Sequence, residues 1–173
     1  MQEVYFPLHF LPLRLHNRCV IFLKNYYVNT TPAIDVLTII HEVNRSVRDS
    51  QVQGGLVTVT VPEPGGAVAM IEPLPEIVEY LKEALKIFPG EGISTKNRRK
   101  EEILIAPRVR AAMVGKSLSI PLHRGKLVMG AREEVVLIDL EESARRREFW
   151  VQVSGEAAEA KKGETPQKSP PKK

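Results

Sequence analysis

The sequence is short of cysteine, of long apolar runs and of signals that direct a chain to a membrane. Cys19 is the only cysteine among 173 residues, so neither an internal disulfide nor a cysteine-based zinc site can form. We expect it to be a small core residue within an apolar run. No uncharged apolar run approaches the roughly 18 residues of a membrane span, and the apolar stretch 4–15 lacks a basic leader. These absences favour a cytoplasmic protein that has no membrane partner.

Motifs for catalysis and for cofactors are also missing. The segment Gly90-Glu91-Gly92 has neither the spacing nor the Lys-Ser/Thr end of a phosphate-binding loop. The pattern around Ser117 and Ser119 does not support a hydrolase triad. The histidines show no pair at metal-ligand spacing and are interpreted as surface residues: His9, His16, His41 and His123. The sequence therefore predicts neither a bound metal nor a cofactor.

The positive charge of the chain is concentrated in its last residues. Residues 155–173 hold five lysines and three glutamates, so they carry +2 of the formal charge of +4. The basic run 96–100 is followed at once by Glu101 and Glu102 and contains no aromatic residue for base stacking. A domain so nearly balanced disfavours nucleic acid as the main partner. Nucleic-acid binding through 96–100 and the tail is the weaker alternative, and a steep salt dependence would be its signature.

The hydrophobic periodicity predicts one α+β domain with antiparallel β-sheets and two main helices. Helices are expected at 38–50, with Thr38 as the N-cap, and at 75–88, with a short third helix at 107–114. A polar loop is expected at 90–102. Strands are expected at 20–28, 31–36, 56–61, 67–71, 117–122, 126–129, 133–140 and 147–153.

Three segments follow from this pattern. Residues 1–19 form an N-terminal arm or an over-extended start, and residues 20–154 form the α+β domain. Residues 155–173 are rich in lysine and proline and contain no large apolar residue, so we expect them to be disordered.

The centre of the pattern is the stretch 54–72. Alternation of valine and threonine over 57–61 predicts a strand with one apolar face and one small, hydroxylated face. Pro62 and Pro64 cannot donate to a β-ladder, and Gly65-Gly66 tolerates positive φ, so the chain must turn there. Glu63 is therefore presented at a rigid corner between two core strands.

Several short motifs together resemble those of the YjbQ family, which is associated with a secondary thiamine-phosphate synthase activity. The similarity spans roughly 22–156, and its motifs are Gly55-Leu56-Val57, Ala67-Val68, Glu72, Ala111, 115–121, 125–130 and 151–156. This resemblance implies an α+β fold with antiparallel sheets and a homotrimer.

The polar site of that family is altered in this sequence. Where relatives have Val-Pro-His-Thr-Thr-Ala-Ala, the chain has Glu63 at the histidine position, and the histidines of an Ala-His-Ala-His-Leu-Lys-Ala segment are Ala106 and Arg108. The family's Gly-Thr-Trp-Gln is Gly130-Ala131-Arg132-Glu133. Imidazoles bind divalent metals and transfer protons near neutral pH, so their loss disfavours the ancestral chemistry.

Two interpretations of the replaced site stay open. If the family geometry is kept, Glu63, Arg108, Arg132 and Glu133 converge on the old cleft. Glu63 would pair with Arg108, and the arginines would bind a small phosphorylated metabolite. Residual synthase-like activity would be the most that remains, with Glu72 as a general base, although an acid beside a proline also fits a solvated or capping group.

The alternative is a non-catalytic homotrimer whose old site is filled by a Glu–Arg pair. The run Arg145-Arg146-Arg147 is interpreted as surface ion pairs with neighbouring glutamates.

Overall fold

The computed structural model describes residues 19–87 and 92–157, which form three helices and ten strands. The helices are α1 (Ile40–Ser50), α2 (Pro75–Ile87) and α3 (Ala106–Val114). The strands are β1 (Cys19–Asn29), β2 (Asp35–Thr38), β3 (Val52–Thr60), β4 (Gly66–Ile71), β5 (Ser94–Lys96), β6 (Glu102–Leu104), β7 (Ser117–His123), β8 (Lys126–Leu127), β9 (Glu134–Asp139) and β10 (Arg146–Ala157).

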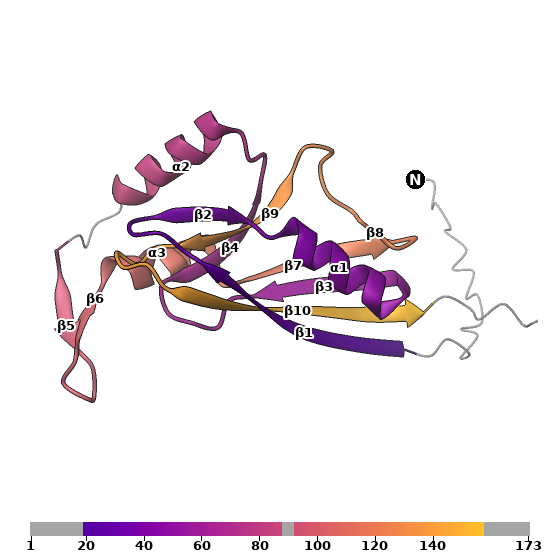
Figure 1. Ribbon diagram of the computed structural model, residues 1–173, viewed down its shortest axis with the longest axis horizontal. Coiled ribbons are helices and arrows are strands. Elements are labelled where there is room, and N and C mark those ends of the chain that lie inside the picture. Colours follow the sequence, from indigo (N-terminus) through magenta and orange to yellow (C-terminus); the bar gives the residue numbers. More distant parts are fainter. Residues whose placement is uncertain (1–18, 88–91, 158–173) are drawn as a thin grey trace, which may run out of the picture.

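Within these residues the strands form two sheets and a separate hairpin, and every pairing is antiparallel. The larger sheet has the order β1-β10-β3-β7-β8, the smaller has β2-β9-β4, and β5 pairs only with β6. The long strands of the larger sheet lie side by side along the length of the molecule, while the β5–β6 hairpin projects at one end (Figure 1). The predicted α+β class with antiparallel sheets is confirmed.

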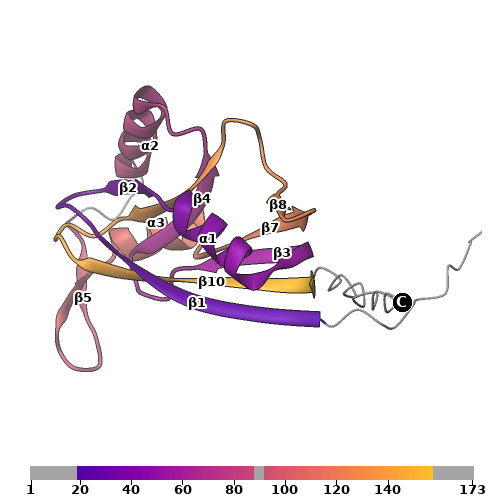
Figure 2. The same cartoon turned by 45° about the vertical axis from the view of Figure 1, so that its right-hand side comes forward.

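Two apolar cores lie on opposite faces of the smaller sheet. In the first, α1 and the smaller sheet pack against the larger sheet, and the buried contributors include Val43, Val59, Leu137 and Phe149. In the second, α2 and α3 cover the other face of the smaller sheet through residues such as Leu85, Ala111 and Ile138. The layers can be followed in Figure 2, where α1 lies over the larger sheet and α2 stands farther out.

The alternation predicted for 57–61 is present in β3. Val57 and Val59 are fully buried, whereas Thr58 and Thr60 lie on the outer face. There the two threonine hydroxyls are hydrogen-bonded to Ser119 and Ser117 of β7, at 3.1 and 3.0 Å. Strand β3 therefore contributes valines to the core on one face and hydroxyl groups to the surface on the other.

Two local predictions were wrong. The N-cap of α1 is Ile39 and not Thr38, because the Thr38 hydroxyl donates to the Glu134 carboxylate on the neighbouring strand β9. Part of the expected loop 90–102 is the β5–β6 hairpin, because Asn97 closes a tight turn by accepting hydrogen bonds from the backbone N–H groups of Arg99 and Glu101.

The ends of the domain also differ from expectation. Cys19 is exposed at the start of β1 and is not a core residue, because its side chain lies on the outer face of an edge strand. Strand β10 continues to Ala157, so the predicted boundary at residue 155 falls inside the larger sheet. The remainder of the predicted arm and tail, 1–18 and 158–173, lies outside the described residues.

Candidate functional site

The corner between β3 and β4 is held by three hydrogen bonds, each accepted by one of its backbone carbonyls. Lys116 Nζ donates to the carbonyl of Pro62 at 2.7 Å, and the N–H of Gly66 donates to the carbonyl of Glu63 at 3.4 Å. The N–H of Leu140 donates to the carbonyl of Gly65 at 2.9 Å. Because Pro62 and Pro64 also fix φ on either side, Glu63 is held in place by its backbone.

Glu63 is joined to Arg147, which is the largest fully buried side chain in the described residues. Arg147 Nη1 donates to Glu63 Oε2 at 3.0 Å and to the carbonyl of Pro64 at 2.8 Å, and Nη2 donates to Asp139 Oδ1. Its Nε has no hydrogen-bond partner among the described residues. A single guanidinium therefore ties the β3–β4 corner to β9 and β10.

Asp139 is fully buried beneath this guanidinium and has three hydrogen-bond donors. The Thr30 hydroxyl donates to Oδ2 at 2.7 Å, and the N–H of Glu141 donates to Oδ1 at 3.1 Å. Burial by itself raises the pKa of Asp139, but the bonds from Arg147 and Thr30 outweigh it and hold the pKa below its ordinary value. The carboxylate therefore stays ionised at neutral pH.

Acid should destabilise the protein through this group. A carboxyl whose pKa is depressed by folding stabilises the fold above its unfolded pKa of about 4, and that contribution is lost as the pH falls through the folded pKa. Thr30→Val removes one of the bonds that lower the pKa of Asp139. We expect the acid-unfolding midpoint, followed by Trp150 fluorescence, to move to higher pH.

The matched control for this prediction is Thr58→Val, which removes a hydroxyl from the outer face of β3. It should leave the acid midpoint unchanged. If both variants keep the midpoint of the parent protein, Asp139 does not govern acid unfolding.

A hollow of about 380 Å³ opens beside this cluster, and we call it the Arg147 hollow. Its lining residues are Glu63, Pro64, Arg108, Glu141, Arg145, Arg146 and Arg147. Glu141 is ion-paired with Arg108 at 3.5 Å and with Arg145 at 3.6 Å. A Cβ at Gly65 would lie 2.6 Å from Glu141 Cγ, so glycine at this position leaves room for the glutamate. Four guanidiniums thus face two carboxylates around the hollow.

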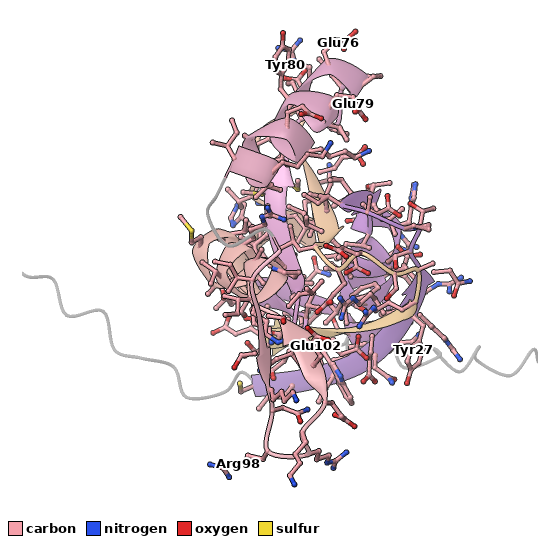
Figure 3. All side chains as sticks on the ribbon, turned by 90° about the vertical axis from the view of Figure 1, so that its left-hand side faces the viewer. Tyr27, Glu76, Glu79, Tyr80, Arg98 and Glu102 are labelled. Atoms are coloured by element: carbon pink, nitrogen blue, oxygen red, sulfur yellow. The ribbon has the colours of Figure 1, made fainter. Side chains whose placement is uncertain are left out.

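Arg146 extends the hollow toward β1. Its guanidinium carbon lies 4.0 Å from the centroid of the Tyr27 ring, a cation–π distance. The Tyr27 hydroxyl donates to Glu148 at 3.1 Å, which orients the ring. Figure 3 shows Tyr27 at the side of the molecule, apart from Arg98 and Glu102 of the β5–β6 hairpin.

The structure brings together only some of the residues predicted for the site. Glu63 and Arg108 both line the Arg147 hollow. The predicted Glu63–Arg108 pair is wrong, because Glu63 is ion-paired with Arg147 of β10, while Arg108 is ion-paired with Glu141. Arg108 Nη1 also donates to the carbonyl of Leu104 at 2.7 Å.

The predicted convergence of Arg132 and Glu133 on the same cleft does not occur. Arg132 pairs with Glu72 at 3.0 Å, and its side chain is 82% exposed. Glu133 accepts the N–H of Gly130 at 2.8 Å and so closes its own turn. Neither residue lines the Arg147 hollow. Glu72, the candidate base, is thus held by an exposed arginine away from the hollow.

Sequence reasoning missed Arg147 and Asp139 as parts of the site. The surface ion pairs predicted for 145–147 are confirmed for Arg145, which pairs with Glu141 at 3.6 Å, but the prediction is wrong for Arg147, which is fully buried. The signal for Arg147 was present, since it shares the period-two positions of Phe149, Val151 and Val153 on the buried face of β10. An arginine on such a face needs a carboxylate partner. Asp139, at the end of the apolar strand β9, was that partner.

Across residues 19–87 and 92–157 no three His, Cys, Asp or Glu side chains gather closely enough to hold a metal ion. The same residues include no helix that is both long and apolar enough to cross a membrane. His41 and His123 are exposed, as predicted, whereas His9 and His16 lie outside the described residues.

These observations define an α+β protein of two packed antiparallel sheets, with an arginine–carboxylate cluster at the corner between β3 and β4. The chain belongs to the YjbQ-like family: the family model described as UPF0047 protein YjbQ-like matches residues 24–156. No curated protein matches the sequence.

Solved structures from several organisms have the same fold. A YbjQ-like protein of unknown function from Sulfolobus solfataricus has a TM-score of 0.68 and 19% identity, over 80% of this chain and 99% of that one. An uncharacterized conserved YjbQ/UPF0047-family protein from Clostridium acetobutylicum has a TM-score of 0.65 and 22% identity, over 74% and 97%. A hypothetical protein from Aeropyrum pernix K1 has a TM-score of 0.66 and 22% identity, over 75% and 95%. At these identities the similarity establishes the fold.

Proposed function

We propose that the Arg147 hollow binds a small phosphorylated metabolite. The observation that carries the proposal is the excess of guanidinium over carboxylate around one concave surface of about 380 Å³. Both lining carboxylates are already engaged, because Glu63 accepts from Arg147 while Glu141 lies between Arg108 and Arg145. Positive charge is therefore left over for an anion.

Three of the arginines are available to a ligand. The side chains of Arg108 and Arg145 are 34% and 36% exposed, and Arg146 is exposed beside Tyr27. A guanidinium offers a planar pair of donors that fits two phosphate oxygens. Arg147 has a different role, because its complete burial makes it the support that holds Glu63 and the corner in position.

Catalysis in the manner implied by the family resemblance is at most residual in this proposal. The positions of the expected imidazoles are occupied by Glu63, Ala106 and Arg108. No imidazole therefore stands at any of these three positions, and imidazole is the side chain that usually transfers protons near neutral pH. A pyrimidine diphosphate and a thiazole phosphate would still be suitable anions for the arginines, so binding is the property to test.

Arg108→Ala should weaken phosphate-ligand binding at least about tenfold, because a hydrogen bond to a charged group contributes about 1.5–3 kcal/mol. The measurement is a thermal-shift titration with inorganic phosphate, pyrophosphate, thiamine precursors and nucleotides. A ligand present at about a hundred times its dissociation constant stabilises by about 2.7 kcal/mol, which is easily resolved.

Arg132→Ala is the matched control, since Arg132 also pairs with a glutamate but lies away from the hollow. It should keep the full ligand-induced shift. Equal shifts in the parent protein, in Arg108→Ala and in an Arg145→Ala/Arg146→Ala variant would contradict the proposed site.

The competing function is a non-catalytic structural homotrimer whose old site is filled by charge pairs. Full burial of Arg147 between Asp139 and Glu63 favours it, because such a cluster fixes the geometry of a core whether or not a ligand binds. Sedimentation of a trimer together with no shift from any phosphate ligand would select this alternative.

A further inference from the structure

Helix α2 buries only one side of its apolar surface. Leu81 and Leu85 pack on the smaller sheet, and Leu85 is the one residue of the helix that is buried. A second apolar stripe, at the helical spacing i, i+3, i+7 and i+10, lies on the exposed side and consists of Ile77, Tyr80, Ala84 and Ile87. Tyr80 and Ile87 are 79% and 83% exposed, so the residues that the structure describes leave this stripe uncovered.

The border of the exposed stripe is acidic. A hollow of about 390 Å³, which we call the α2 hollow, lies beside Tyr80, and its lining residues are Pro75, Glu76, Glu79, Tyr80 and Glu83. Glu76 has no ion pair with any residue that the structure describes. Glu79 and Glu83 pair with lysines three positions later, at 3.0 and 2.7 Å, but such pairs at the surface contribute little. The lining of the α2 hollow thus combines an aromatic ring with three carboxylates and contains no cation.

The β5–β6 hairpin has the opposite charge and is also unsupported. Among the described strands, β5 and β6 pair only with each other, and a two-stranded hairpin alone is marginally stable in water. The tip has three consecutive exposed cations without an ion pair to any described residue, namely Arg98, Arg99 and Lys100. The glutamates that follow, Glu101 and Glu102, are hydrogen-bonded to side chains within the hairpin. The cations of the tip are therefore available to an anionic surface.

The hairpin tip and the α2 hollow are far apart within one chain. Figure 3 shows Glu76, Glu79 and Tyr80 at one extremity of the molecule and Arg98 at the other. In Figure 1 the sheets lie between α2 and the hairpin. Contact between the two surfaces therefore requires two molecules.

We propose that the β5–β6 hairpin of one copy of the chain docks on α2 of a second copy. The cations of the tip would contact the carboxylates of the α2 hollow, and Ile93, which is 54% exposed at the base of the hairpin, would lie near Ile87 on the exposed stripe. The lengths of the two surfaces agree, because a strand advances about 3.3 Å per residue and a helix about 1.5 Å. Residues 93–98 and 76–87 thus each span on the order of 16 Å.

The charges favour this contact over a symmetric one. Two copies of α2 packed about a two-fold axis would bring the carboxylates of both hollows together, and two hairpin tips would bring together cations alone. Juxtaposed like charges disfavour both arrangements, whereas the hairpin on α2 joins opposite charges. Each copy then contributes a different surface on either side, so the assembly closes as a ring where the rotation between copies permits it.

The test is sedimentation velocity of the full chain at about 0.1 M and about 1 M salt. The screening length falls from about 10 to about 3 Å over this range, so the parent protein should self-associate at low salt and dissociate at high salt. Charge reversal of the tip, Arg98→Glu/Arg99→Glu/Lys100→Glu, should raise the dissociation constant at least about tenfold at low salt, because like charges then face each other.

Charge reversal of the other surface, Glu76→Lys/Glu79→Lys/Glu83→Lys, should weaken self-association to a similar extent. An equimolar mixture of the two variants should associate again, because every hairpin then meets an α2 of opposite charge. Recovery in the mixture also shows that both variants are folded.

The matched control is Arg45→Glu/Arg124→Glu/Lys126→Glu, which makes the same change of net charge at exposed residues outside both surfaces. It should sediment like the parent protein. A parent protein that stays monomeric at low salt, or a mixture that does not associate, would overturn the proposal. Arg108→Ala should also sediment like the parent protein, so failure here is distinct from failure of the proposed metabolite site.

Discussion

Replacing Arg147 with methionine should destabilise the protein by about 3–5 kcal/mol, the cost of leaving a buried charge without its partner. Methionine has a similar length and can fill the space, so the loss comes mainly from electrostatics and not from a cavity. Asp139 would then be fully buried with only Thr30 and the Glu141 N–H as donors. The measurement is the free energy of unfolding in urea at neutral pH.

The control for this prediction is Glu63→Gln, which breaks only the solvent-facing half of the cluster. The Glu63 side chain is 39% exposed, so its pair with Arg147 is screened and the loss should be about 1 kcal/mol or less. A double variant, Arg147→Met/Asp139→Asn, removes the uncompensated carboxylate and should be more stable than Arg147→Met alone. Equal losses for Arg147→Met and Glu63→Gln would show that the cluster is not a buried charge network.

The Arg147 variant also bears on function, because the same guanidinium holds the corner that shapes the hollow. Its bonds to Glu63 and to the Pro64 carbonyl fix one wall, while Arg108 and Arg145 form the wall beside Glu141. Arg147→Met should therefore weaken the proposed phosphate binding through displacement of the wall, whereas Arg108→Ala should remove a proposed direct contact without a comparable loss of stability.

Local patterns in the sequence were enough to predict most elements of the fold. The valine–threonine alternation of β3, for example, depends only on which face of that one segment is buried. The N-cap of α1 was not predictable in this way, because Glu134 on β9 competes for the Thr38 hydroxyl. That competition exists only after the chain has folded.

The candidate site was predicted only in part, because the partners of its charged side chains come from segments that are distant in the sequence. The position of Glu63 at the corner was predictable from the prolines on either side of it, and Arg108 was predictable from the family motifs. Their ion-pair partners, however, are determined by strand register. Glu63 and Arg147 are 84 positions apart in the sequence. Three consecutive arginines beside glutamates resemble a surface run, and only the alternation along β10 separates Arg147 from the exposed Arg146.

Register also explains why two motifs, a hundred residues apart, each contain a glycine. Gly55 of β3 pairs with Gly155 of β10, and the two backbones approach closely at that point. A Cβ on Gly155 would lie 2.1 Å from the carbonyl oxygen of Gly54, and a Cβ on Gly55 would lie 2.0 Å from that of Ser154. The obstructing atoms belong to the backbone, so no change of rotamer can relieve the overlap.

Gly155→Ala is accordingly expected to cost about 3 kcal/mol of unfolding free energy, from overpacking combined with a φ of +154° that alanine rarely adopts. Gly54→Ala is the matched control, because its Cβ would meet nothing closer than the Leu122 carbonyl oxygen at 4.0 Å. That variant should stay within about 1 kcal/mol of the parent protein in the same urea titration. A Gly155→Ala variant as stable as Gly54→Ala would mean that β3 and β10 separate easily. Contacts other than this glycine pair would then have to fix the register that places Arg147 beneath the corner.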